Sequence, residues 1–335
     1  PAQVSRVEKN IFSSTGSLAF SWDAPADNGT SIVHYNIQYR ENGNSVWINW
    51  SPNQSTSSVS ISGLIDGNQY DVRIAANNGL QGEFSNTFTK SVTAVSSASL
   101  SVWYDATDIS SMYSDSACTT PIVNDGDSVA CWADKSGNGN DAIQATIGDE
   151  PSFNQTGFNN LETISFDGAG DGYDFTTGIS TSRDIFVVES GHGYLFAGGG
   201  SYRIIPFYTS TSRMYWQFTG ADNDAATWRN TTSLQISYWS RNTAGEYIVA
   251  TNGTDRKNYL VDGGVTAVAE TLDRIGLRWD SGTAVPSWTG EISEIVILNG
   301  IVTSNERELI EGYLACKWDL QAQLPGEHLY ASTCP

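Results

Sequence analysis

Residues 290–298 read Gly-Glu-Ile-Ser-Glu-Ile-Val-Ile-Leu, and residues 303–318 read Thr-Ser-Asn-Glu-Arg-Glu-Leu-Ile-Glu-Gly-Tyr-Leu-Ala-Cys-Lys-Trp. The first run is rich in β-branched residues and predicts a strand from Glu291 to Leu298. The second run opens with a capping-box pattern, because Thr303 is followed three positions later by Glu306. The two runs therefore predict a strand followed by a helix.

The predicted helix has one apolar face. The residues that recur on this face are Leu309, Ile310, Tyr313 and Leu314. Such spacing places side chains on a single stripe of an α-helix. We therefore expect an amphipathic helix from Asn305 to about Trp318, docked on a β-sandwich.

The remaining sequence after residue 100 predicts strands separated by glycine-rich turns. Clear examples are Thr163–Phe166, Asp184–Val188, Met214–Phe218 and Tyr247–Ala250. About a dozen strands in a segment of this length require two large packed sheets. We expect an all-β sandwich with a single helix near its C-terminal end.

Residues 1–95 also alternate between apolar and polar side chains. The alternating segments are Ser17–Trp22, Val33–Tyr39, Val59–Ile61 and Tyr70–Ala75. Turn-forming residues separate them, among them Pro25 and Asn28-Gly29. Seven or so short strands predict a separate β-sandwich. Residues 96–99 are small and polar and are interpreted as a linker.

The first segment resembles the fibronectin type III domain. The resemblance rests on Trp22, Pro25, the run Tyr35–Arg40, Trp47, the pair Leu64 and Tyr70, Asn77-Asn78-Gly79 and Ser85. It implies that the hydroxyl of Tyr70 forms a hydrogen bond with nearby backbone, as in a tyrosine corner. Such modules commonly act as spacers, and no Arg-Gly-Asp is present.

Residues 100–335 resemble the concanavalin A-like and laminin-G-like jelly rolls of bacterial surface proteins. The segments that carry the resemblance are Val102–Ala106, Trp132–Asp141, Ser165–Gly168, Thr251–Gly253, Gly290–Ile295, Ile310–Trp318 and Leu324–Tyr330. The resemblance implies an extracellular or surface-displayed domain that binds glycans or proteins. Cys316 departs from the family pattern, which usually has an aromatic or small residue there.

The charge of the chain limits its partners. Seventeen basic residues stand against 37 acidic ones, a formal net charge of −20. This charge repels nucleic-acid phosphates and anionic membrane surfaces, so we expect neither as a partner. No run of about 18 apolar residues is present. We expect a soluble chain without membrane insertion, secreted or on a cell surface, whose export signal lies outside residues 1–335.

The four cysteines fall into two local pairs, Cys118 with Cys131 and Cys316 with Cys334. Each pair encloses turn-forming residues and is interpreted as a disulfide, which implies an oxidising compartment. A zinc site is the alternative, with His34, His192 or His328 as further ligands. No Cys-x-x-Cys occurs to support it.

Two acidic, glycine-rich loops are candidate Ca²⁺ sites, because Ca²⁺ prefers carboxylate and carbonyl oxygens. The first contains Asp134, Asn138, Asn140 and Asp141, and the second contains Asp167 and Asp171. The spacing is not that of an EF-hand. The alternative is that these side chains bond to local backbone amides. A third acidic segment, Asp222-Asn223-Asp224, is a weaker candidate.

Aromatic residues among polar ones between Tyr194 and Trp239 suggest a sugar-binding surface, because sugar CH faces stack on aromatic rings. The candidate ligand-binding residues are Tyr202, Arg203, Trp228, Arg229 and Asn230. The alternative is that such aromatics fill the sandwich core.

A glycoside hydrolase is the enzymatic alternative, since some enzymes of this fold use two carboxylates on one strand. The nearest pattern is Glu291 and Glu294, and a spacing of three places alternate side chains on opposite strand faces. We therefore expect no catalytic residues and no enzymatic activity. A Gly-x-Ser-x-Gly motif is also absent.

Together the patterns predict an adhesion or lectin-like protein. The second domain recognises a glycan or a surface protein, with Ca²⁺ as a candidate cofactor. The chain could form a homo-oligomer or be part of a larger surface assembly. A structural subunit of an extracellular filament, appendage or virion is the alternative from another class, because fold alone does not specify a ligand.

Overall fold

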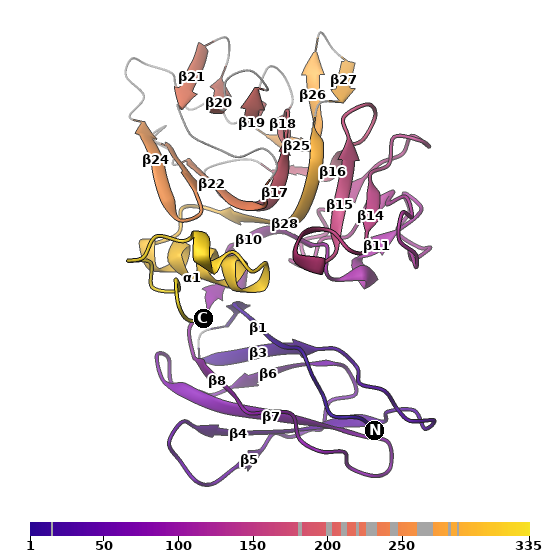
Figure 1. Ribbon diagram of the computed structural model, residues 1–335, viewed down its shortest axis with the longest axis vertical. Coiled ribbons are helices and arrows are strands. Elements are labelled where there is room, and N and C mark those ends of the chain that lie inside the picture. The colour runs from indigo at the N-terminus through magenta and orange to yellow at the C-terminus, as the bar shows by residue number, and fades with distance from the viewer. Residues whose placement is uncertain are drawn as a thin grey trace. The chain divides into compact units, whose positions relative to one another are not determined.

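The computed structural model describes two compact units, residues 1–98 and residues 99–334 (Figure 1). The described residues exclude 15, 180–182, 199–202, 209–212, 219–220, 226–232, 242–246, 260–270, 281–282 and 287. Side chains are additionally left undescribed at 98, 203–208, 213–218, 221–225, 241, 247, 256–259, 278–280 and 283–286.

The first unit is a sandwich of two sheets. One sheet has the order β1-β3-β6, the other has the order β5-β4-β7-β8, and β2 pairs in parallel with β9. The strands are β1 (Val7–Asn10), β2 (Phe12–Ser13), β3 (Ser17–Trp22), β4 (His34–Glu41), β5 (Ile48–Asn49), β6 (Ser58–Ser62), β7 (Gln69–Asn77), β8 (Phe88–Ser91) and β9 (Val95–Ser96). Alternating apolar residues of both sheets form its core, as the sequence pattern predicts.

The predicted tyrosine corner is present. The backbone N–H of Ile65 donates to the hydroxyl of Tyr70 over 3.3 Å. In the core, Trp22 and Tyr35 meet edge to face, with ring centroids 5.0 Å apart. Residues 96–99, expected as a linker, include Ser96 at the end of β9 and a 3₁₀ turn at Ser97–Ser99.

The second unit contains two large sheets in the part of the chain that the structure describes. The eight-stranded sheet has the order β14-β15-β28-β17-β22-β23-β24, with β10 also paired to β28. The nine-stranded sheet has the order β11-β12-β13-β16-β25-β18-β19-β20-β21, and β26 pairs with β27. This arrangement confirms the expected all-β sandwich.

The strands of the second unit are β10 (Leu100–Asp105), β11 (Met112–Tyr113), β12 (Cys131–Trp132), β13 (Ala142–Ile143), β14 (Ser152–Asn154), β15 (Thr163–Asp167), β16 (Tyr173–Ile179), β17 (Arg183–His192), β18 (Phe196–Gly198), β19 (Arg203–Tyr208), β20 (Arg213–Phe218), β21 (Ala221–Ala225), β22 (Gln235–Arg241), β23 (Tyr247–Thr251), β24 (Thr254–Tyr259), β25 (Leu272–Ile275), β26 (Leu277–Asp280), β27 (Thr283–Pro286) and β28 (Thr289–Asn299). Short 3₁₀ turns lie at Ile109–Ser111, Phe158–Asn160 and Gln321–Gln323.

Strand β28 contains a bulge that overturns one prediction. Val188 of β17 pairs with Glu294, but the next residue, Glu189, pairs with Ile292, so Ser293 is the extra residue. Ile292 and Ile295 consequently both face the core. Glu291 and Glu294 therefore share the opposite face of β28, and the expectation that they lie on opposite faces is wrong.

Helix α1 (Ser304–Lys317) begins where the capping box predicts. Thr303 accepts a hydrogen bond from the backbone of Glu306, and the Glu306 side chain accepts one from the backbone of Thr303. The apolar face of the helix is buried, with Leu309, Ile310 and Leu314 at most 4% exposed. No helix in the described residues is long and apolar enough to cross a membrane.

A buried carboxylate joins helix α1 to strands β10 and β28. Glu294, which is 0% exposed, accepts hydrogen bonds from the indole N–H groups of Trp103 and Trp318 and from the hydroxyl of Tyr313. The ammonium group of Lys317 lies 3.0 Å from Glu294 Oε2. The side chains of the predicted strand and helix are thus partners in one cluster.

A second carboxylate, Asp105 of β10, completes this cluster. Lys317 Nζ is 2.5 Å from Asp105 Oδ1, and Lys135 Nζ is 2.7 Å from Asp105 Oδ2. Burial alone would raise the pKa of Asp105, but the charges of Lys317 and Lys135 lower it. Burial raises the pKa of Glu294, because Lys317 only partly compensates for the lost solvation. Two acids and two lysines thus offset each other's charge in the interior.

Both predicted disulfides are present. Cys118 is bonded to Cys131, and Cys316 is bonded to Cys334. No free cysteine remains. Each bond restricts a local loop in the unfolded chain, which stabilises a domain by about 3 kcal/mol in the loop-entropy description. The second bond holds the C-terminal tail to the end of helix α1.

Replacement of Glu294 by glutamine should destabilise the second unit by about 3 kcal/mol, because Lys317 loses one of its two buried counter-charges and an amide N–H₂ faces several donors. The matched control is Glu291→Gln, on the same face of the same strand. Glu291 is only partly buried and accepts from Asn154 and Thr163. Urea denaturation at pH 7 measures both. Equal effects of the two substitutions would contradict this role of Glu294.

Candidate functional site: a polar pocket beside helix α1

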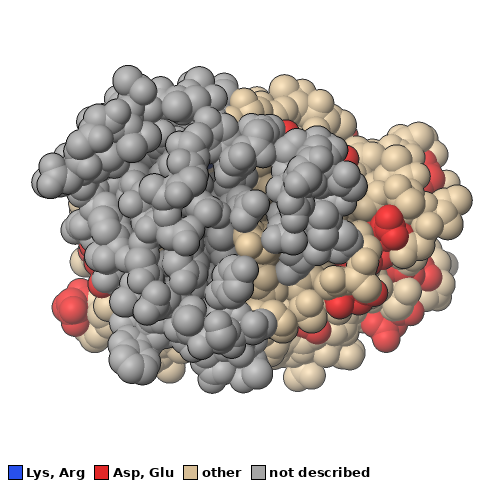
Figure 2. All heavy atoms as spheres, turned by 90° about the horizontal axis from the view of Figure 1, so that it is seen from above, with Lys and Arg blue, Asp and Glu red and all other residues tan. Residues whose placement is uncertain are grey.

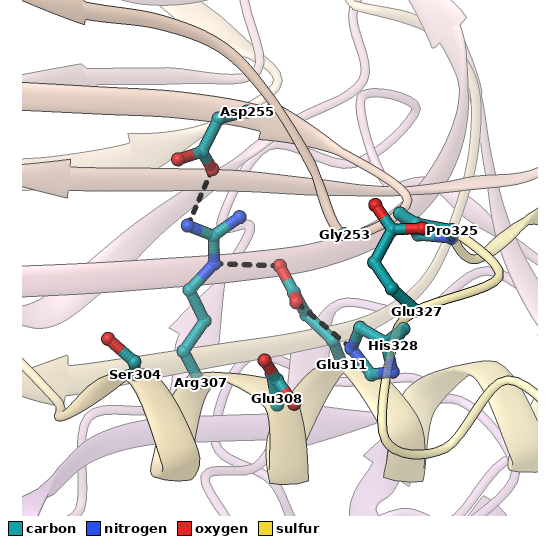
Figure 3. A pocket seen from close by; sticks show the side chains of 9 residues that line it. All are labelled: Gly253, Asp255, Ser304, Arg307, Glu308, Glu311, Pro325, Glu327 and His328. Carbon is teal, nitrogen blue, oxygen red and sulfur yellow. Dashed lines mark hydrogen bonds and ion pairs between the residues drawn. The ribbon is translucent and has the colours of Figure 1, made fainter.

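A pocket of about 230 Å³ lies between helix α1, the β23–β24 turn and the C-terminal tail (Figure 3). Three separate segments of the second unit therefore build it. Its lining consists of Gly253, Asp255, Ser304, Arg307, Glu308, Glu311, Pro325, Glu327 and His328. Polar and charged side chains from distant parts of the sequence meet there.

Arg307 is the fixed cation of the pocket. Its Nη1 lies 2.6 Å from Asp255 Oδ1, and its Nε lies 2.9 Å from Glu311 Oε1. The guanidinium group also lies over the ring of Tyr238, 4.3 Å from the centroid, where it gains a cation–π contact. Figure 3 marks no bond from its remaining nitrogen to the residues drawn. Asp255 and Glu311 thus bind two edges of the guanidinium group, and the ring of Tyr238 packs against one of its faces.

Tyr238 of β22 connects Arg307 of the pocket to Asp184 of β17. Its hydroxyl donates to Asp184 Oδ1 over 3.1 Å, and Asp184 Oδ2 accepts from the backbone N–H of Val302 over 2.7 Å. Burial raises the pKa of Asp184, while the hydrogen bonds that it accepts lower it. These contacts fix the segment that leads into helix α1.

The C-terminal tail closes the other side of the pocket. His328 Nε2 lies 3.3 Å from Glu311 Oε2, and both side chains are almost fully buried. Gly312 makes this approach possible, because a β-carbon there would come within 2.5 Å of Tyr330. The Cys316–Cys334 bond holds the same tail. Gly312 and Cys316 therefore both help to hold the C-terminal tail against helix α1.

Four carboxylates line the pocket beside one guanidinium group. They belong to Asp255, Glu308, Glu311 and Glu327, and the lining also contains Arg307 and His328. Glu327 is exposed, and Glu308 Oε2 is inaccessible to solvent without a hydrogen-bond partner. A ligand group that donates hydrogen bonds, such as a sugar hydroxyl or an ammonium group, matches these acceptors.

The predicted ligand-binding residues lie elsewhere. Tyr202, Trp228, Arg229 and Asn230 fall outside the described residues, and Arg203 is described only by its backbone in β19. Of the aromatics in that stretch, Tyr238 and Trp239 are buried, at 2% and 0% exposure. For these two side chains the core alternative is the one observed.

The first predicted calcium loop is bonded to its own backbone. Asp134 Oδ1 accepts from the N–H groups of Trp103 and Ser136, and its Oδ2 accepts from Asn140 N and Ser136 Oγ. Asp141 accepts from the N–H of Asp134. The side-chain amides of Asn138 and Asn140 donate to carbonyl groups of residues 100–101. These bonds are the ones that the alternative of local backbone bonding predicts for this loop.

The second acidic loop is more crowded with negative charge. Asp171 Oδ2 accepts from Asp167 N, and Asp167 Oδ1 accepts from Ala169 N. Burial, with Asp167, Asp149 and Glu150 nearby, raises the pKa of Asp171 to about 6. A β-carbon at Gly170 would lie 2.5 Å from Asp149 Oδ1, which shows how closely these loops approach.

One cluster of potential metal ligands is present in the described part of the chain. In the described part of the chain, the only group of three or more His, Cys, Asp or Glu residues with ligand atoms within 4.8 Å is Cys118, Cys131 and Asp141. Both of these cysteines are oxidised. Acidic side chains are nevertheless visible on the described part of the face in Figure 2, where no Lys or Arg is seen. The described part of that face therefore presents acidic side chains.

The pocket was missed by reasoning from sequence. Arg307 and Glu311 are four residues apart on the predicted helix, a spacing that signals an ion pair but not a cavity. Asp255 precedes the helix in the sequence and His328 follows it, so no local pattern links them. The only available signal was the likeness of residues 324–330 to the closing segment of the jelly-roll family.

Substitution of Asp171 by asparagine should stabilise the protein at pH 7 by about 1 kcal/mol, and by much less at pH 4. The folded-state pKa of Asp171 is raised from 3.8 to about 6. The folded state therefore binds the proton more tightly, and its contribution to stability is full below pH 3.8 and is lost as pH rises through 6. Thermal unfolding at both pH values, with Asp125→Asn as the exposed control, measures the difference. A stabilisation that does not depend on pH would contradict this origin.

Comparison with known proteins supports the assignment of the first unit. The fibronectin type III domain model matches residues 4–91. No curated protein matches the chain. Among solved structures, the chain is similar to domain 4 of AbnA, a GH43 extracellular arabinanase from Geobacillus stearothermophilus in complex with arabinotriose. The identity is 14%, with 62% of this chain and 95% of that chain covered, at a TM-score of 0.43.

Shorter similarities cover about the length of the first unit. One is to a human "forth FNIII domain" in solution, with 23% identity over 29% of this chain and 82% of that chain, at a TM-score of 0.26. Another, titled "Myokine structure", has 18% identity over 28% of this chain and 98% of that chain, at a TM-score of 0.25. The family match, the two-sheet topology and the tyrosine corner agree: the first unit is a fibronectin type III domain.

Proposed function

We propose that this chain is an extracellular or cell-surface adhesion protein. The fibronectin type III domain acts as a spacer, and the second unit recognises a glycan or peptide ligand. The observation that carries this proposal is the pocket around Arg307, which gathers fixed hydrogen-bonding groups from three segments. The two disulfides suit an oxidising compartment. The resemblance of residues 100–335 to the concanavalin A-like and laminin-G-like jelly rolls of bacterial surface proteins supports the same function.

The pocket suits binding rather than bond cleavage. Arg307, Glu311 and His328 are already paired with one another, so they form a fixed wall. Glu308 and Glu327 supply acceptors to a ligand, because neither is part of that paired wall. Glu291 and Glu294, the carboxylates considered for glycoside hydrolysis, are bound in two separate hydrogen-bond networks. We propose no catalytic activity for the chain.

We propose Ca²⁺ as a cofactor, and the loop that contains Asp167 and Asp171 is its first candidate site. Asp167 and Asp171 would hold the ion, because crowding of carboxylates there disfavours the charged state of Asp171. A bound Ca²⁺ would neutralise this repulsion and fix the loop. The Asp134 loop is the second candidate site of this proposal, and both oxygens of Asp134 accept hydrogen bonds from local donors.

A glycan and peptide array tests the function directly when it is run once with Ca²⁺ and once with a chelator. We expect binding to a restricted set of ligands. The double substitution Glu308→Gln and Glu327→Gln should weaken binding more than tenfold, a loss above about 1.4 kcal/mol. The matched control is Glu83→Gln, an exposed acid of the first unit, which should leave affinity unchanged.

Two outcomes would overturn the proposal. If no ligand binds under either condition, a structural subunit of an extracellular assembly becomes the better account. If a ligand binds but the pocket substitutions have no effect, the binding surface lies elsewhere. Loss of binding in chelator alone would support Ca²⁺ dependence.

A further inference from the structure

Three buried side chains in the second unit are placed for a covalent reaction. Lys317 Nζ lies 2.5 Å from Asp105 Oδ1 and 3.0 Å from Glu294 Oε2. The side chains of Lys317, Asp105 and Glu294 are 4%, 6% and 0% exposed. An amine, a carboxyl group and a second carboxyl group that contacts the amine thus meet where water is excluded.

We propose that Lys317 and Asp105 condense to an intramolecular amide, with Glu294 as the proton carrier. This cross-link would be a self-modification of the folded chain and is independent of the ligand proposed for the pocket. It would join β10, at the beginning of the second unit, to the end of helix α1.

The reaction balances without any further reagent. The Lys317 ammonium gives one proton, through Glu294, to the Asp105 carboxylate, which leaves a neutral amine and a neutral acid. The amine nitrogen attacks Asp105 Cγ, and the C–N bond forms. Glu294 then moves a second proton from that nitrogen to the departing hydroxyl, the C–O bond breaks, and one water molecule leaves. No atom is oxidised or reduced.

Burial favours this chemistry in two ways. Burial by itself raises the free energy of the charged side chains, and the nearby lysines offset this cost for Asp105, so the neutral pair is the minor form from which the reaction proceeds. Fixed contact between the two groups also replaces a bimolecular encounter, which raises the effective concentration greatly. The product amide is neutral, so one positive and one negative charge leave the interior.

Lys135 has a different position and a different role. Its Nζ lies 2.7 Å from Asp105 Oδ2, on the other oxygen of the carboxyl group, and 3.0 Å from Asp108. Its side chain is 21% exposed. Lys135 lies between the carboxylates of Asp105 and Asp108 and stays charged, and it would stabilise negative charge on Oδ2 during the attack on Cγ. Lys317, which contacts Glu294, is the nucleophile.

Intact-mass spectrometry of the purified, denatured full chain tests the proposal. We expect a mass lower by one water molecule than the sequence with two disulfides requires. After reduction and trypsin digestion, a branched peptide should connect the segments that contain Asp105 and Lys317. A wild-type chain of full mass after prolonged incubation at neutral pH would overturn the proposal.

Three substitutions locate the reacting groups. Lys317→Arg keeps the charge but lacks the nucleophilic amine, and Glu294→Gln removes the proton carrier, so both should have the full mass. Lys90→Arg, in strand β8 of the first unit, is the matched control and should retain the cross-link. A branched peptide at Lys135 in place of Lys317 would contradict the assignment. Circular dichroism verifies that each variant is folded, and the wild-type mass decides the question even if a variant is not.

Discussion

The second unit depends on the burial of one carboxylate. Glu294 lies in the bulged part of β28, where its charge is removed from water and must be compensated by the protein. Its partners come from β10 and from both the middle and the end of helix α1. A strand at the beginning of this unit, a strand near its end and the only α-helix among the described residues are thereby required to meet at one point.

The pocket is a consequence of this arrangement. Once helix α1 is docked, Arg307 in the first half of the helix meets Asp255 of β24 and the ring of Tyr238. The tail that follows the helix folds back over Gly312 and brings His328 to Glu311. The pocket is therefore held by the docked helix and by a tail that a disulfide anchors, and a change that releases the helix should also remove the pocket.

Local patterns predicted the regular elements well. The capping box at Thr303, the tyrosine corner at Tyr70 and the two cysteine pairs all have short-range causes, and each is found as expected. The bulge at Ser293 could not be predicted, because an extra residue in a strand leaves the run of apolar residues unbroken. The pocket could not be predicted either, because it depends on Asp255, Arg307 and His328 lying close together in the folded chain. The Asp134 loop shows a further limit, since the same residues suit an ion or a set of backbone donors.

The central claim is that Glu294 energetically couples the sheet to helix α1. A double-mutant cycle with Glu294→Gln and Trp318→Phe measures this coupling most directly, because the indole N–H of Trp318 donates to Glu294 over 2.8 Å. Urea denaturation of the four proteins should give a coupling energy of about 1 kcal/mol or more. Additive effects of the two substitutions, with no coupling energy, would contradict the account.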